Sequence, residues 1–130
     1  YSILSGRYRV HREQWADSAG RRTVPIEIYY HPGHEYNLKR IAAGARAALD
    51  YCSKNFSPYQ YDQIRFVEFP RYAAFAQAFA GTIPFSESIG FVAKIDDNNP
   101  EDVDYPFYVA AHEVAHQWWG HQVCGAPVQG

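Results

Sequence analysis

The sequence predicts an α/β (α+β) fold in which a mixed sheet of about four to five strands packs with two main helices. Strand, helix and strand patterns follow one another over residues 23–69, and a largely apolar helix pattern spans 105–119. The chain has 130 residues, of which 47% are hydrophobic, enough for one core but hardly for two. We therefore expect a single domain over 1–130, with a strand or hairpin region at 1–22 and the sheet and second helix at 23–130.

The first two strands are indicated by alternation and by residue type. Residues 7–14 alternate as a strand does, and residues 23–30 are rich in β-branched and aromatic side chains. The sequence Asp-Ser-Ala-Gly at 17–20 predicts a turn or hairpin between them.

A helix and a third strand follow. Residues 35–55 place apolar side chains at three-and-four spacing, as in an amphipathic helix, and Gly44 lowers the helix propensity slightly. Residues 63–69 alternate as a strand that Pro70 closes. Because a helical crossover joins parallel strands, strands 23–30 and 63–69 should lie parallel in one sheet, with the helix on one face.

The region before the second helix carries weaker signals. Residues 71–85 are small and aromatic and include Gly81 and Pro84, so we expect an irregular loop. A short strand is expected over 87–94, and an acidic connector at 96–100 leads to the second helix.

Composition limits the class of partner. The 12 basic and 14 acidic residues give a formal net charge of −2, which provides no electrostatic reason to expect nucleic acid or an anionic membrane. No run of eighteen apolar residues indicates a membrane span, so we expect no direct membrane contact in this segment. Cys52 and Cys124 are too few for a disulfide framework and do not indicate a compartment. A chain that lacks methionine and begins at Tyr1 suggests a piece of a longer protein.

The second helix has start and stop signals. Asp104 suits the N-cap, Pro106 is allowed in the first turn, and Gly120 is a natural stop. The helix is apolar nearly all round, so it should be buried. A glutamate and two histidines in its middle would be unfavourable without a partner, and a metal ion with its water supplies one.

The pattern His-Glu-x-x-His at 112–116 is the most specific feature of the sequence. Residues at i and i+4 differ by roughly 40° around a helix, so His112 and His116 can both bind one metal ion. Glu113 lies about 100° further round, where it can act on a metal-bound water without being a ligand. The alternative is an amphipathic helix in which two histidines share a face by accident.

A catalytic zinc needs a third protein ligand beside its water. His121 would point roughly 140° away from the metal on a continuing helix, which makes it a poor ligand. Trp119 and Gln122 stand where a metzincin needs Gly and His, which disfavours that class. Cys124 would reach the metal only if the chain doubles back after Gly120, and a buried thiol is the simpler interpretation.

The sequence His-Glu-Val-Ala-His-Gln-Trp-Trp-Gly at 112–120 resembles the active-site helix of the aminopeptidase N-like zinc metallopeptidases, which belong to the gluzincins. The resemblance extends from about Pro25 to the end of the chain. It implies a partial thermolysin-like catalytic domain that binds Zn²⁺ through His112 and His116. It also implies peptide substrates, cleaved at their N-terminal bonds by a metal-activated water with Glu113 as the catalytic acid and base.

The family also carries a Gly-Ala-Met-Glu-Asn strand whose glutamate binds the free α-amine of the substrate. The corresponding stretch is 84–90, with Glu87 in the place of that glutamate and Gly90 matching a later glycine. The resemblance thus implies a substrate-binding role for Glu87 on an exposed edge strand. A surface carboxylate is the other interpretation, and the replacement of Met and Asn by Ser86 and Ser88 leaves the aminopeptidase specificity open.

In gluzincins the third zinc ligand is a glutamate that would fall five positions beyond Gly130. The resemblance therefore implies a fragment of a catalytic domain that binds zinc weakly and lacks peptidase activity on its own. The helix face that would meet the rest of that domain, including some of Trp118, Trp119 and Val123, should be exposed and favour self-association.

Two other interpretations remain open. The chain could be a non-catalytic, peptidase-like binding or structural domain of a larger, membrane-associated protein. It could also be a structural domain in which the histidine pattern is accidental.

Overall fold

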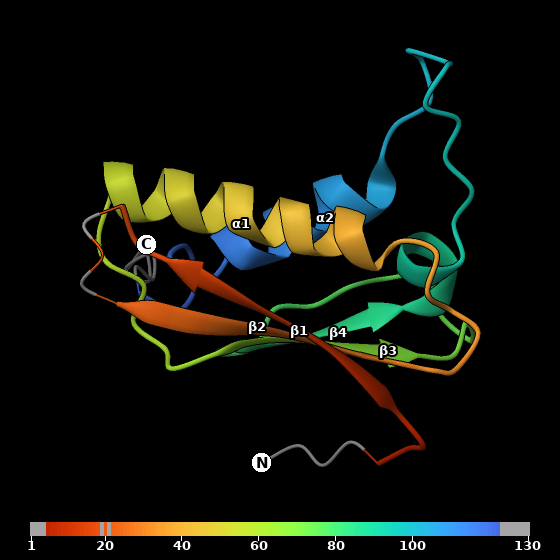
Figure 1. The fold of residues 1–130 in the computed structure, drawn as a ribbon, viewed down its shortest axis with the longest axis horizontal. Coiled ribbons are helices and arrows are strands. Elements are labelled where there is room, and N and C mark those ends of the chain that lie inside the picture. Colours follow the sequence, from red (N-terminus) through yellow and green to blue (C-terminus); the bar gives the residue numbers. More distant parts are fainter. Residues whose placement is uncertain (1–4, 19, 21, 123–130) are drawn as a thin grey trace, which may run out of the picture.

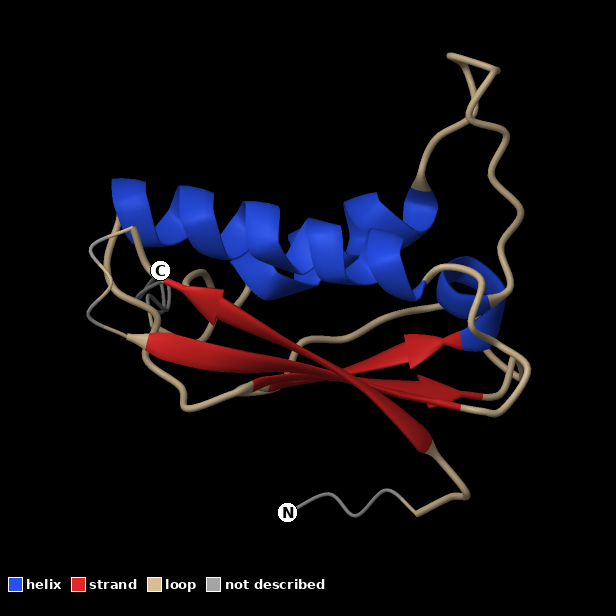
Figure 2. Cartoon of the chain, in the orientation of Figure 1, coloured by secondary structure: helices blue, strands red, loops and turns tan. Residues whose placement is uncertain are grey.

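The computed structural model describes residues 5–18, 20 and 22–122, which form two layers. A four-stranded sheet with the order β1-β2-β3-β4 forms one layer, and both helices lie on one face of it (Figures 1 and 2). The elements in chain order are β1 (Arg9–Ala16), β2 (Thr23–Tyr30), α1 (Leu38–Asn55), β3 (Ile64–Phe69), β4 (Thr82–Ser86), the π-helical turn η1 (Glu87–Phe91) and α2 (Tyr105–Ala115). Among the described residues, no helix has both the length and the apolar character needed to cross a membrane.

The sheet confirms the predicted α+β class and the predicted pairing of its first three strands. β1 and β2 form an antiparallel hairpin, and β2, β3 and β4 run parallel. Alternate residues of β2 and β3 point at the helices and are fully buried, among them Ile26, Ile28 and Phe66. On the opposite face of the sheet, Glu27 accepts hydrogen bonds from Arg12 at 3.2 Å and from Arg65 at 2.7 Å, and the buried Val67 and Phe69 also point to that side.

The region from residue 71 to residue 94 differs from the prediction. The expected irregular loop contains β4, in which the buried Ile83 and Phe85 alternate with Thr82 and Pro84. This alternation is a strand signal, but a proline inside a strand pattern argues against a strand in sequence reasoning. The strand expected over 87–94 is wrong, because those residues begin with η1, in which Val92 N donates to Glu87 O at 2.9 Å.

The two helices pack closely at Gly44. A Cβ atom built on Gly44 would lie 2.3 Å from the backbone oxygen of Phe107 and 3.2 Å from Cβ of Ala110. A side chain of any size would therefore force α1 and α2 apart. Gly44, which the sequence indicates only as a small loss of helix propensity, is needed where α1 crosses the motif helix.

The second helix is shorter and less buried than predicted. It ends at Ala115 rather than near residue 119, and only one side of it, including Ala110 and Val114, faces the core. Of the residues some of which are expected to be exposed, Trp119 is 43% exposed, whereas Trp118 is buried at 2%. Val123 lies outside the described residues.

Candidate metal centre

An aspartate that caps α2 and forms an ion pair fixes the start of this helix. Asp104 Oδ1 accepts a hydrogen bond from Phe107 N at 3.1 Å, which confirms the predicted N-cap. The other carboxylate oxygen of Asp104 accepts from Arg40 of α1 at 2.6 Å. Pro106 occupies the first turn, where its missing N–H removes no helical hydrogen bond. The helix that carries the histidine pattern thus has a defined beginning.

The two motif histidines converge on one point. His112 Nε2 and His116 Nε2 lie 3.2 Å apart, and the two rings are nearly perpendicular at 86°. Two nitrogen ligands at about 2.0–2.1 Å from a tetrahedral zinc ion are separated by about 3.3 Å. His116 Nδ1 lies 3.2 Å from Trp119 O, and an N–H donated to that carbonyl leaves the Nε2 lone pair free for a metal. Both residues are exposed, so a metal ion and a substrate can reach them.

Glu113 faces a cavity rather than an ion pair. The residue is 8% exposed, and its carboxylate has no hydrogen-bonding or ion-pair partner among the described residues. A cavity of about 330 Å³ is lined by Glu113, His116, residues 76–78 and residues 119–121. A carboxylate that faces such a cavity without a partner can exchange a proton with a water molecule there.

The residues that follow the motif connect the helix to the sheet. Gln117 is fully buried and accepts from Gly81 N at 2.8 Å, while its amide donates to Phe79 O at 3.0 Å. Trp118 Nε1 donates to Ser57 O at 2.8 Å. The two bonds of Gln117 hold the segment before β4 against the motif helix, and that segment pairs antiparallel with β4 through the bridges Ala76–Phe85 and Phe79–Thr82. Gln117 therefore positions one wall of the cavity, while Trp118 joins the end of the helix to the loop after α1.

His121 lies closer to the cavity than the helix pattern predicted. The prediction assumed a helix continuing beyond His116, but α2 has ended and Gly120 adopts a φ of 102°, so the chain turns and His121 lines the same cavity. Its Nε2 lies 3.2 Å from Ala78 O. Within the described residues no third ligand atom completes a group with His112 and His116. Cys124 lies outside the described residues.

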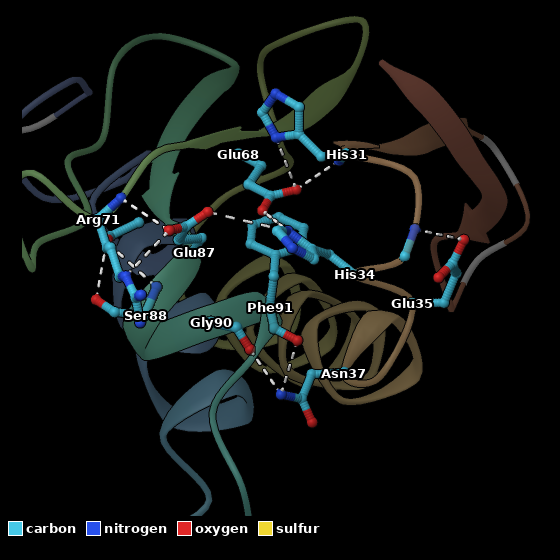
Figure 3. A network of polar contacts seen from close by, with 12 residues as sticks. His31, His34, Glu35, Asn37, Glu68, Arg71, Glu87, Ser88, Gly90 and Phe91 are labelled. Carbon is cyan, nitrogen blue, oxygen red and sulfur yellow. Dashed lines mark hydrogen bonds and ion pairs between the residues drawn. The ribbon is translucent and has the colours of Figure 1, made fainter. Parts of the chain in front are cut away.

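Glu87 lies in a different setting from the predicted edge strand. It is the first residue of η1, and its carboxylate accepts from Arg71 N at 3.2 Å and lies 4.0 Å from His34 Nδ1 (Figure 3). No described contact joins Glu87 to the motif residues, and the irregular segment that lines their cavity carries Ala76, Gln77 and Ala78 instead. The substrate-binding role of Glu87 stays a prediction.

Sequence reasoning missed a second group of metal-ligating side chains. His31, His34 and Glu68 bring their ligand atoms within 4.8 Å of one another. The two histidines of this group stand in the sequence His-Pro-Gly-His directly after a strand, which could have indicated a metal site. Nothing in the neighbouring sequence indicates that Glu68 lies beside them.

No family model matches the sequence. Among proteins of known name it is 31% identical over 101 residues to "Aminopeptidase 2" of Candida albicans, a match that covers 77% of this chain and 11% of that protein. It is 35% identical over 115 residues to "Probable aminopeptidase 1" of Saccharolobus solfataricus, covering 85% of this chain and 14% of that protein. The chain thus spans 10 to 14% of the length of the curated relatives that it matches.

Solved structures share the fold. Aminopeptidase A of Legionella pneumophila, solved in complex with aspartic acid, superposes with a TM-score of 0.73 at 20% identity, over 87% of this chain and 13% of that one. An M1 zinc metallopeptidase of Deinococcus radiodurans superposes with a TM-score of 0.51 at 20% identity, over 85% of this chain and 22% of that one. The fold is therefore that of a peptidase domain. The sequence is thus similar to aminopeptidases over the region that the chain spans, and its fold resembles that of an M1 zinc metallopeptidase.

Proposed function

We propose that the chain is the part of a zinc-dependent aminopeptidase that carries its metal-binding helix. The observation that carries the proposal is the convergence of His112 Nε2 and His116 Nε2, 3.2 Å apart, beside a cavity that Glu113 lines. The matched proteins are named aminopeptidases. The imidazole rings of His112 and His116 are suitable ligands for a zinc ion.

Each motif residue has a distinct role in this proposal. His112 and His116 hold the metal, and a zinc ion, when bound, polarises a carbonyl and lowers the pKa of water to about 7. Glu113 accepts the proton of the attacking water and delivers it to the leaving amine, a function that fits a carboxylate without another partner. Trp119 O orients the ring of His116 through Nδ1.

The resemblance suggests that Glu87 holds the α-amine of the substrate. Its present contacts with Arg71 and His34 mean that a substrate ammonium would have to compete with two groups for one carboxylate. The wall formed by Ala76, Gln77 and Ala78 supplies no acid near Glu113. Replacing Glu87 by Gln should therefore raise KM for substrates with a free α-amine, while N-acetylated peptides should be cleaved no better.

The 130 residues alone should bind zinc weakly, because only two ligand atoms converge at the motif within the described part of the chain. This is also the observation that favours the second candidate function, a non-catalytic domain that binds peptides. Dialysis against zinc-free buffer followed by metal analysis tests the prediction. Zinc retained at one equivalent, or turnover of an aminoacyl reporter substrate by this chain, would contradict it.

The longer protein tests the enzymatic proposal. Glu113→Gln should abolish turnover of the reporter substrate while one zinc ion stays bound, and His116→Ala should lose both zinc and turnover. Glu101→Gln, at an exposed acid ahead of α2, is the matched control and should change neither. Full turnover in Glu113→Gln would refute the catalytic role and favour the binding domain.

We further propose that the exposed aromatic face of α2 supports self-association. Tyr105 and Tyr108 are 52% and 59% exposed, and Trp119, which follows the helix and packs edge-on against Phe56, is 43% exposed. Sedimentation over a range of concentrations tests this, and a monomer at the highest concentration would contradict it.

A further inference from the structure

Three side chains with metal-binding groups meet where β2 and β3 end. His31 directly follows β2, His34 lies in the loop that leads to α1, and Glu68 is the penultimate residue of β3. Figure 3 shows both rings turned toward the carboxylate of Glu68, with Glu87 beside His34. In Figure 1 the arrowheads of β3 and β4 lie on the side where α2 begins, whereas the motif lies toward the other end of that helix. The group therefore shares no residue with the candidate catalytic site.

Glu68 is a buried carboxylate that no lysine or arginine in the described part of the chain contacts. Its side chain is 0% exposed, and its alternation places it on the face of β3 that packs toward the helices. Among the described residues, it accepts from His31 N at 2.5 Å and otherwise faces His31 Nδ1 at 3.3 Å and His34 Nδ1. An ionised carboxylate in such surroundings needs a cation close by.

The backbone around this group holds the two rings in place. Gly33 adopts a φ of 95°, and His34 N donates to His31 O at 3.0 Å, so a tight turn brings both rings to the same side. Tyr8 packs against the ring of His31 with 5.0 Å between ring centroids and donates to Glu68 O at 3.0 Å. The arrangement is thus supported from β2, from β3 and from the segment before β1.

We propose that His31, His34 and Glu68 form a second metal site, which binds a divalent transition-metal ion through two imidazoles and one carboxylate. Zinc suits this donor set best, because imidazole favours transition metals over Ca²⁺ and Mg²⁺. The 3.3 Å between His31 Nδ1 and Glu68 Oε2 equals the ligand separation of about 3.3 Å expected around a tetrahedral ion. The contact between His34 and Glu68 is shorter and would open by a fraction of an ångström.

Glu87 lies beside this group of three residues, and a small shift of its side chain would make it a fourth ligand, in place of the substrate-binding role that the resemblance suggests. Its Oε2 lies 4.0 Å from His34 Nδ1, while its other oxygen contacts Arg71. A metal bound by all four residues would join the loop after β2, the end of β3 and the start of η1. The site would then be structural, because it closes its own coordination with protein ligands and ties three segments together.

Cobalt(II) is the metal to use in the test, because it replaces zinc and reports its coordination by visible absorption. The starting chain carries His112→Ala and His116→Ala, so that the motif contributes nothing. We expect it to bind one equivalent of Co²⁺ and to gain thermal stability with it. Adding His31→Ala and His34→Ala should weaken binding roughly 100-fold or more, and adding Glu87→Gln instead should weaken it roughly 10-fold.

A matched control comes from β1, where His11 Nε2 and Glu13 Oε1 form a similar pair at 2.9 Å. His11→Ala should leave Co²⁺ binding unchanged. Circular dichroism establishes whether each variant is folded. If the double alanine variant does not fold, His34→Gln, which replaces the ring by a polar side chain, takes its place. The proposal is overturned if the starting chain binds no Co²⁺, or if the histidine substitutions leave its affinity unchanged, which would identify an ion-pair cluster only. Neither result bears on the motif site.

Discussion

Within residues 5–122, as far as the structure describes them, two groups of two histidines and one glutamate occur, and their surroundings differ. In the motif group, the histidines are exposed, their Nε2 atoms converge at 3.2 Å, and Glu113 has no partner among the described residues. In the group at the ends of β2 and β3, the glutamate is fully buried and both histidines face it. The comparison teaches that the same residue types suit catalysis when the acid is left unpaired, and structural binding when the acid is held by its neighbours.

The largest expected effect concerns Glu113, the acid of the motif group. Glu113→Gln in the longer protein should lower kcat roughly 10²–10⁴-fold with zinc and thermal stability retained, because in the proposed mechanism Glu113 transfers protons and its carboxylate has no partner among the described residues. Kinetics with an aminoacyl reporter and a melting curve measure the two effects. A large fall in melting temperature would remove the contrast between the two groups.

The next largest effect concerns the contact between α1 and α2 at Gly44. Gly44→Ala should lower the free energy of unfolding by about 3 kcal/mol, because its Cβ would lie 2.3 Å from Phe107 O and the helices would have to separate. Chemical denaturation measures it. Ala47→Ser, at an exposed position of the same helix, is the control and should stay within about 0.5 kcal/mol. Equal stabilities for the two variants would mean that α1 and α2 do not pack as described.

The substitution Glu68→Gln tests the group at the ends of β2 and β3. It should lower the free energy of unfolding by about 1–3 kcal/mol, because a buried amide cannot satisfy the donors that face the carboxylate. Zinc binding at the motif of the longer protein should be unaffected. Metal analysis beside denaturation separates the two readouts, and loss of motif zinc in a folded Glu68→Gln variant would mean that the groups are coupled.

The smallest effect is expected from a paired carboxylate on the face of the sheet that points away from the helices. The hydrogen bond from Arg65 lowers the pKa of Glu27, with Arg12 adding to it and burial opposing it. The folded pKa is thus below the unfolded one, so the stabilisation is complete above about pH 4.5 and is lost as the pH falls through the lowered pKa. Because Arg65 is 43% exposed, we expect under about 1 kcal/mol.

Denaturation of the Glu27→Gln variant at neutral and acid pH measures this contribution. The variant should be less stable than the parent near neutral pH, and the difference should shrink at acid pH. A difference that grows on acidification would contradict the assigned direction of the shift.

The comparison also explains what could be predicted from the sequence. The parallel pairing of β2 and β3 follows from a crossover rule, and the motif lies within one helix, where spacing fixes geometry. The strand β4 was missed because Pro84 masks the alternation of its buried residues. The early end of α2 was missed as well, and with it the position of His121 at the cavity.

The group of His31, His34 and Glu68 could not be predicted for a physical reason. Its members come from two strands and a loop, and only the register of the parallel sheet, in which Tyr29 pairs with Val67, brings residue 31 beside residue 68. No spacing within the sequence encodes that register. Non-local sites of this kind become visible only once the sheet is assembled.

The central claim is that His112 and His116 bind one zinc ion. An anomalous difference map recorded at the zinc edge from zinc-loaded crystals tests it most directly. We predict a peak at about 2.0–2.1 Å from both Nε2 atoms, with the Glu113 carboxylate outside the coordination sphere. Rings turned away from each other without a shared peak, or a peak bound by Glu113 in place of one imidazole, would contradict the claim.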